Sequence, residues 1–129
     1  MAEGGNFMHT ILVVDDQEGI RFLLKEVFKG GKYRVVTAAD GAEALTKWEE
    51  WGPDLVLLDM KMPGLDGLDV LRKLAEKHRQ VPVIMMTAYG ELQIVEEALG
   101  LGAKGYITKP FDILELRQTV DTILAGAGK

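Results

Sequence analysis

Acidic residues stand directly after two short apolar runs of the sequence. Asp15 and Asp16 follow the run at 11–14, and Asp59 follows the run at 55–58. Carboxylates brought together in this way repel one another unless a cation lies between them. Oxygen ligands without Cys or His favour a hard ion, and a few carboxylates completed by water suit Mg²⁺ better than an all-protein Ca²⁺ site. These residues therefore predict a magnesium site, at which Mn²⁺ could substitute.

Two further apolar runs end in residues that suit a phosphoryl group. Thr87 and Ala88 end one run, and Lys109 and Pro110 end the other, so a hydroxyl, backbone N–H groups and an ammonium are expected at the same place. Such groups can hold the equatorial oxygens of a phosphoryl group. Taken singly, each residue has an ordinary explanation as a strand end, a solvated side chain or, for the aspartates, a helix N-cap. Their joint positions carry the prediction.

The apolar runs also predict the elements that would position these side chains. Because the runs do not alternate with polar residues, they are typical of strands buried on both faces in a parallel sheet. The runs lie at 11–14, 35–36, 55–58, 83–86 and 106–107. Segments with helical spacing lie between and after them, at 20–28, 42–51, 68–75, 92–99 and 113–124. We therefore predict a doubly wound α/β domain with a five-stranded parallel sheet, in which ligands bind at the carboxyl ends of the strands.

The size and composition of the chain fit one such domain. It has 129 residues, 47% of them hydrophobic, and we expect a disordered lead at 1–8, the domain at 9–125 and a tail at 126–129. The formal charge of −5 disfavours nucleic acid and anionic membranes as partners. No apolar run approaches the ~20 residues of a membrane-spanning helix. A cytoplasmic monomer is the expectation.

The residues singled out above closely resemble the motifs of the response-regulator receiver family. The stretches that carry the resemblance are Asp15-Asp16, residues 57–67, Met86-Thr87-Ala88 and Lys109-Pro110-Phe111. The resemblance extends over residues 9–125 and implies a flavodoxin-like receiver fold with strand order 2-1-3-4-5. It also implies that Asp59 accepts the phosphoryl group, that Asp16, Asp59 and the Lys61 carbonyl bind Mg²⁺, and that Asp15 acts mostly through water.

The same resemblance implies roles for the residues of the last two strands. Thr87 and Lys109 would hold the phosphoryl group, and the Lys109-Pro110 peptide bond would be cis. Tyr106 stands at the position of the family's switch aromatic, where an inward turn of the ring accompanies movement of Thr87. The alternative for Tyr106 is an ordinary half-buried strand residue. Lys61 and Tyr89 are expected to overhang the acyl phosphate and to slow its hydrolysis.

The partners implied by the resemblance are a sensor histidine kinase and, downstream, a histidine phosphotransferase; a phosphatase is a further candidate. We expect docking on the first helix and on the loop after the fifth strand, although Ile20 and Leu23 could equally be buried. The predicted docking residues are Gln17, Gly19, Ile20, Leu23, Pro110 and Phe111. Such a protein catalyses its own phosphorylation, and it is a phosphotransferase only if it passes the group onward.

Other functional classes share parts of this sequence pattern. The resemblance is strongest to receivers that relay phosphate in sporulation, although those carry His where Tyr106 stands. The alternative within the family is a chemotaxis-type receiver, whose phosphorylation switches binding to an effector. A haloacid-dehalogenase-like phosphatase would need an Asp where Lys61 stands. A flavodoxin-type FMN binder is disfavoured because Asp15 and Asp16 would repel the cofactor's phosphate.

Overall fold

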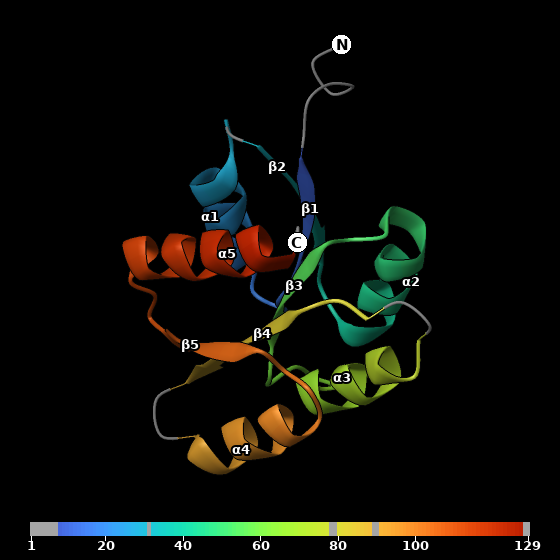
Figure 1. The fold of residues 1–129 in the computed structure, drawn as a ribbon. Helices are drawn as coiled ribbons and strands as arrows, with labels where there is room; N and C mark the ends of the chain where they lie inside the picture. The colour runs from blue at the N-terminus through green and yellow to red at the C-terminus, as the bar shows by residue number, and fades with distance from the viewer. Residues whose placement is uncertain (1–7, 31, 78–79, 89–90, 128–129) are drawn as a thin grey trace.

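Strands and helices alternate along the chain, as the apolar runs predict (Figure 1). The computed structural model describes residues 8–30, 32–77, 80–88 and 91–127, so most of the predicted lead lies outside the described residues. The strands are β1 (His9–Val14), β2 (Tyr33–Ala38), β3 (Leu55–Asp59), β4 (Val83–Ala88) and β5 (Gly105–Lys109). The helices are α1 (Glu18–Phe28), α2 (Gly41–Trp51), α3 (Gly67–Ala75), α4 (Leu92–Gly100) and α5 (Ile113–Ala127).

The strands form one parallel sheet in the order β2-β1-β3-β4-β5, which confirms the predicted doubly wound fold. The register aligns the carboxyl ends of the central strands. Val14 pairs with Leu58, and Asp59 pairs with Met86. Ala88 in turn pairs with Lys109. Residues that are far apart in the sequence are therefore brought to one edge of the sheet.

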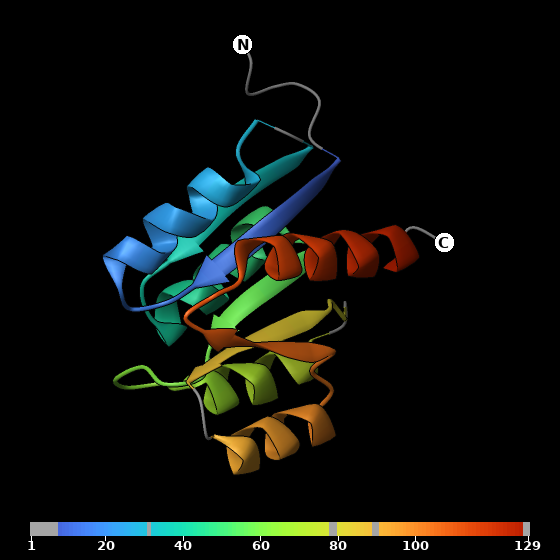
Figure 2. The same ribbon diagram turned by 90° about the vertical axis from the view of Figure 1, so that its left-hand side faces the viewer.

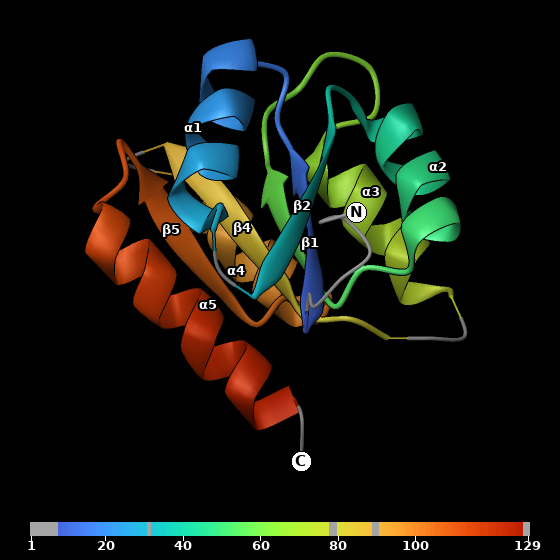
Figure 3. The ribbon, with the colours of Figure 1, turned by 90° about the horizontal axis from the view of Figure 1, so that it is seen from above.

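Each face of the sheet has its own hydrophobic core, because successive strand residues point to opposite faces. Ile11 and Val13 belong to the core covered by α1 and α5, whereas Leu12 and Val14 belong to the core covered by α2, α3 and α4. Figures 2 and 3 show the sheet between these two layers of helices. All four residues are buried, and each such side chain contributes about 1.5–3 kcal/mol by leaving water. The two cores hold the strand ends in fixed register.

The last helix is longer than its apolar spacing predicts. The spacing ends near Leu124, but α5 continues to Ala127 and so includes part of the predicted tail. The additional turn is an Ala-containing segment, and Ala has the highest intrinsic helix propensity. An amphipathic pattern reports only the turns that touch the core, so it misses a solvent-facing last turn.

Candidate functional site

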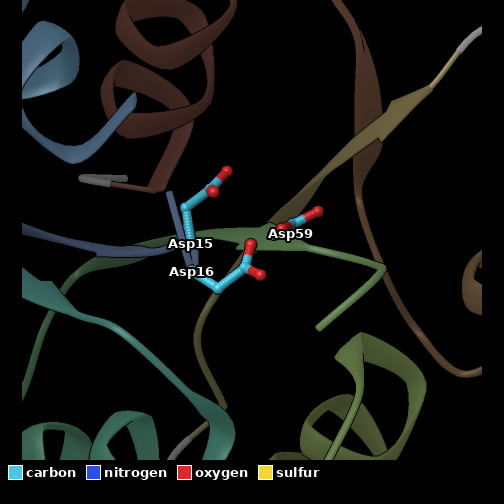
Figure 4. Close-up of side chains that lie close together, drawn as sticks. All are labelled: Asp15, Asp16 and Asp59. Carbon is cyan, nitrogen blue, oxygen red and sulfur yellow. The ribbon is translucent and has the colours of Figure 1, made fainter. Parts of the chain in front are cut away.

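Three aspartates cluster where β1 and β3 end (Figure 4). Asp15, Asp16 and Asp59 each offer a carboxylate oxygen, and these oxygens lie within 4.8 Å of one another. Asp15 and Asp59 are buried, and Asp16 is exposed. The sequence prediction that the two strand ends bring these side chains together is confirmed. A group of oxygen ligands of this size and charge fits a hard divalent cation.

Asp15 is held by the ends of several different elements. Its backbone N–H donates to the Ala38 carbonyl at 3.1 Å. Its carboxylate accepts from the Gln17 backbone N–H at 2.9 Å and from Lys109 Nζ at 2.6 Å. Its own carbonyl accepts from Arg21 Nη1 at 2.8 Å. The Asp15 carboxylate thus faces Lys109 across the site, and Gln17, the N-cap residue of α1, makes no side-chain cap.

Asp59 brings the end of β3 into the cluster. Its Oδ1 accepts from the Lys61 backbone N–H at 3.2 Å and lies 3.6 Å from Lys109 Nζ. Burial raises the pKa of Asp59 to about 6, and the negative charges of Asp15 and Asp16 add to the rise, while Lys109 and the Lys61 amide oppose it. The carboxylate is therefore ionised at neutral pH but less solvated than a surface carboxylate. An anion in such a setting can act as a nucleophile.

Gly67 allows α3 to begin directly against the backbone of Asp59. A Cβ atom at this position would lie 2.5 Å from the Asp59 carbonyl oxygen and 2.6 Å from Met60 Cα. Both neighbours are backbone atoms of the β3 end and cannot move aside without disturbing the site. The Gly67 N–H also donates to the Met60 carbonyl at 3.2 Å. A residue larger than glycine here would displace the strand end that carries Asp59.

Thr87 and Lys109 lie on the β4–β5 side of the same edge, and Tyr106 lies nearer the start of β5, where it pairs with Met85. Thr87 is buried and pairs with Thr108 in the sheet. The side chain of Tyr106 is 50% exposed, and a cavity of about 160 Å³ is lined in part by Thr87 and Tyr106. The predicted cis peptide bond between Lys109 and Pro110 is confirmed. The switch role of Tyr106 stays a prediction, and the cavity gives its ring a place to enter.

The Lys61 side chain extends toward α4. Lys61 Nζ lies 2.6 Å from Glu91 Oε2, and Glu91 Oε1 accepts from the Ala88 N–H at 3.1 Å. The hydrogen bond with Lys61 lowers the pKa of Glu91, and the same bond raises the pKa of Lys61. The Ala88 amide, one of the backbone N–H groups expected at this edge, is therefore already occupied by the carboxylate of Glu91. Tyr89, the other residue expected to overhang the site, lies outside the described residues.

The predicted docking residues fall into two groups. Ile20 and Phe111 are partly buried against the core under α1 and α5. The other four are exposed: Gln17, Gly19, Leu23 and Pro110. Neither Ile20 nor Leu23 is wholly buried, so both can be reached by a partner.

Sequence reasoning assigned no role to three residues that border the site, Arg21, Glu91 and Gly67, or to Phe22 on α1. Arg21 and Glu91 contact it through long side chains, and Gly67 permits the close approach of α3. Phe22 is 66% exposed beside Leu23, which is 37% exposed. The sequence places Phe22 outside the apolar face of its helix, but single exposed apolar residues are common and do not by themselves mark a site. No local pattern pointed to Glu91, whose contacts depend on two loops meeting.

Comparison with known proteins decides the family. A model of the response regulator receiver domain matches residues 11–121. The chain belongs to the response-regulator receiver family. It is 49% identical to sporulation initiation phosphotransferase F of Bacillus subtilis, over 88% of the chain and 92% of that protein. Chemotaxis protein CheY of the same organism is 35% identical, over 90% of the chain and 98% of that protein.

Solved structures agree with this assignment. The crystal structure of a putative response regulator from Chloroflexus aurantiacus superposes with a TM-score of 0.85 at 34% identity, covering 91% of the chain and 98% of that protein. Several other curated relatives are longer, and the chain spans about half of their length or less. As part of a two-component system, a receiver domain works with a histidine kinase or another phosphotransfer partner. Among the described residues, no helix is both long and apolar enough to cross a membrane.

Receiver domains bind Mg²⁺ through an acidic pocket, and the residues of this receiver fit such an ion. The donor set consists of carboxylate oxygens, with no sulfur or imidazole among them. Two of the three carboxylates are buried, and among the described residues one ammonium, that of Lys109, lies close to both Asp15 and Asp59. Three negative charges against one positive charge leave the cluster under-compensated, which a divalent cation would correct.

Proposed function

We propose that this receiver accepts a phosphoryl group from a histidine kinase onto Asp59, in a Mg²⁺-dependent manner, and passes it to a histidine phosphotransferase. The observation that carries the proposal is the position of Asp59, a buried carboxylate that lies within reach of both the acidic cluster and Lys109. Its raised pKa, caused first by burial, marks it as a poorly solvated anion in the position where the attack would take place.

The chemistry is an exchange of one bond to phosphorus for another. A carboxylate oxygen of Asp59 forms a bond to phosphorus while the P–N bond of the donor's phosphohistidine breaks, and the electron pair of that bond returns to the imidazole. Mg²⁺ at Asp15, Asp16, Asp59 and the Lys61 carbonyl would offset charge on the transferring group. Lys109 and the Thr87 hydroxyl would hold the phosphoryl oxygens. Transfer onward to a second histidine reverses the same steps.

We favour a relay over other receiver functions because the chain is similar to a known phosphotransferase. Sporulation initiation phosphotransferase F is 49% identical over 92% of its length, so a sporulation relay is the proposed setting. The second candidate is a chemotaxis-type switch, favoured by the match to almost the whole of CheY and by the cavity beside Tyr106. In that case phosphorylation turns the ring of Tyr106 inward and changes affinity for an effector.

Docking would bring the partner's histidine to Asp59. The first turns of α1 carry Gln17, Gly19, Ile20 and Leu23, and the loop after β5 carries Pro110 and Phe111. A mixed surface of half-buried apolar and exposed small residues suits a helical partner, whose histidine must approach closely. Gly19 is useful here because a Cβ built on it meets nothing within 4 Å, so the partner's backbone finds open space.

Phosphotransfer in both directions tests the proposal. The purified protein is phosphorylated with Mg²⁺ and acetyl phosphate, freed of donor, and mixed with a histidine phosphotransferase from the source organism. Under the relay proposal, the phosphoryl group leaves Asp59 and appears on the histidine of the phosphotransferase soon after the two proteins are mixed. Phosphorylation without onward transfer, together with a change in effector affinity, would support the chemotaxis-type function. Absence of phosphorylation on Asp59 would reject both.

A further inference from the structure

Glu91 connects the two loops that border the proposed phosphoacceptor. One of its carboxylate oxygens accepts from the Ala88 N–H at 3.1 Å, and the other lies 2.6 Å from Lys61 Nζ. Its side chain is only 12% exposed, whereas that of Lys61 is 69% exposed. A glutamate usually keeps its charge in water, so these two charge-assisted contacts must hold it in place.

This arrangement leaves the first turn of α4 without a capping hydrogen bond from a side chain. Glu91 is the N-cap residue of α4, but its side chain makes no capping hydrogen bond. It points back toward β4 instead of forward to the helix. An N-cap side chain normally accepts from an N–H of the first turn, and that bond is absent here. Glu91 therefore has a second place to go if its contacts with Ala88 and Lys61 are broken.

The contacts of Glu91 conflict with the proposed acyl phosphate. Asp59 pairs with Met86, so Thr87 and Ala88 are the next residues of β4 beside it. A phosphoryl group on Asp59 needs donors for its oxygens, and the Ala88 N–H is at hand for one of them. A carboxylate is also an anion whose oxygens accept hydrogen bonds. The Glu91 carboxylate and the phosphoryl group would compete for one N–H, and two negative charges beside the same N–H repel each other.

We propose that Glu91 is an internal competitor of the phosphoryl group: phosphorylation displaces its carboxylate from the Ala88 amide and opens its ion pair with Lys61. This inference rests on the proposed function. It makes Glu91 a positioning residue that slows phosphorylation and couples it to the start of α4. Once displaced, the side chain can turn to the first turn of α4, and Lys61 is released over the site.

Variants of Glu91 test the competition directly. We expect Glu91→Ala to be phosphorylated by acetyl phosphate and Mg²⁺ about two- to tenfold faster than wild type, the range that one hydrogen bond of ordinary strength spans. Glu91→Gln keeps an acceptor but loses the charge, so its rate should fall between the two. The matched control is Glu97→Ala, which removes a carboxylate of the same helix that pairs with Arg72 at 2.7 Å. A Glu91→Ala rate equal to or below wild type overturns the proposal.

A second measurement tests the contact without any phosphoryl group. The amide resonance of Ala88 should move upfield in Glu91→Ala, and its hydrogen exchange should become faster, because the acceptor is gone. An unchanged resonance and exchange rate would show that the contact is absent in solution and would overturn the proposal. Failure of the proposed function is distinguishable: wild type would then take no phosphate on Asp59. Normal phosphorylation of wild type without a gain in Glu91→Ala rejects the competition alone.

Discussion

The helices of this receiver begin in two different ways. At α2, α3 and α5 an aspartate accepts a hydrogen bond from the backbone N–H three residues later: Asp40 from Glu43 at 2.8 Å, Asp66 from Asp69 at 3.0 Å and Asp112 from Glu115 at 3.1 Å. At α1 and α4, which follow β1 and β4, no side-chain cap is made. At α4 the N-cap side chain, Glu91, contacts Ala88 and Lys61 instead.

At α4 this difference shows that capping and site chemistry compete for the same side chain, because the N-cap residue Glu91 reaches Lys61 and Ala88 and makes no capping hydrogen bond. At α1 the N-cap residue is Gln17, and Asp15, two residues before it, faces Lys109. A capped helix start gains roughly 1 kcal/mol of stability. The two starts beside the site forgo it, and removing a site carboxylate should therefore affect the protein in the opposite way to removing a cap.

The largest effect is expected for Asp59→Asn. The variant should take no phosphate from acetyl phosphate or from kinase, because the nucleophilic oxygen is lost. It should also unfold less readily in Mg²⁺-free buffer, by about 1–2 kcal/mol at neutral pH, since a pKa unit is worth about 1.4 kcal/mol and solvent reduces the gain. Denaturant unfolding measures this difference. Phosphate retained at full stoichiometry would contradict the role of Asp59.

The pH dependence of that difference has a definite sign. The pKa of Asp59 rises from 3.8 to about 6 on folding, so between these values the folded state binds more proton than the unfolded state. The stability of wild type should therefore fall, relative to Asp59→Asn, as pH rises from 4 through 6. Near pH 4 the free energies of unfolding of wild type and Asp59→Asn should be similar. A gap that stays constant across this window would mean that Asp59 titrates normally.

The next largest effect separates the α1 surface from the rest of the exposed apolar residues. Leu23→Ala should lower the rate of phosphotransfer from the kinase about tenfold, because a buried interface anchor is commonly worth 1–2 kcal/mol or more. Phosphorylation by acetyl phosphate should change little, since it needs no docking. Leu99→Ala is the matched control, because Leu99 is also exposed but lies at the far end of α4. Equal loss with both donors would indicate simple destabilisation.

A several-fold effect is expected on the lifetime of the acyl phosphate. Lys61→Asn shortens a side chain at the rim and offers a polar group that can orient water, so the phosphate should be lost faster. The predicted metal ligand, a backbone carbonyl, is kept. Label remaining on the protein after removal of the donor gives the rate. Lys104→Asn, a change at the opposite end of β5, serves as control, and an unchanged rate in Lys61→Asn would refute shielding by this side chain.

The smallest effect completes the comparison on the capped side. Asp40→Ala should lower the free energy of unfolding by about 0.5–2 kcal/mol, since the Glu43 N–H loses its acceptor. The rate of phosphorylation should stay within about twofold of wild type. Asp59→Asn should abolish phosphorylation and raise the free energy of unfolding. Asp40→Ala should keep phosphorylation and lower the free energy of unfolding. A strong loss of phosphorylation in Asp40→Ala would show that the two kinds of aspartate are not independent.

Local patterns in the sequence were enough to predict the elements and the central residues of the site. The five apolar runs and the helical spacings between them indicate strands and helices without knowledge of the tertiary structure. Asp15, Asp16 and Asp59 could be placed together because the carboxyl ends of parallel strands share one edge. The cis bond before Pro110 followed from family resemblance and not from any local pattern.

The partners of several polar side chains depend on the tertiary structure. Asp40 finds its partner, the Glu43 N–H, three residues away, whereas the partner of Asp15 is Lys109, which is 94 positions away and is brought near by the sheet. The contact of Glu91 with Lys61 likewise depends on two loops meeting. Local sequence selects backbone conformation and burial, but a charged side chain selects its partner from whatever the assembled strands place within a few ångströms. That choice cannot be read from spacing along the chain.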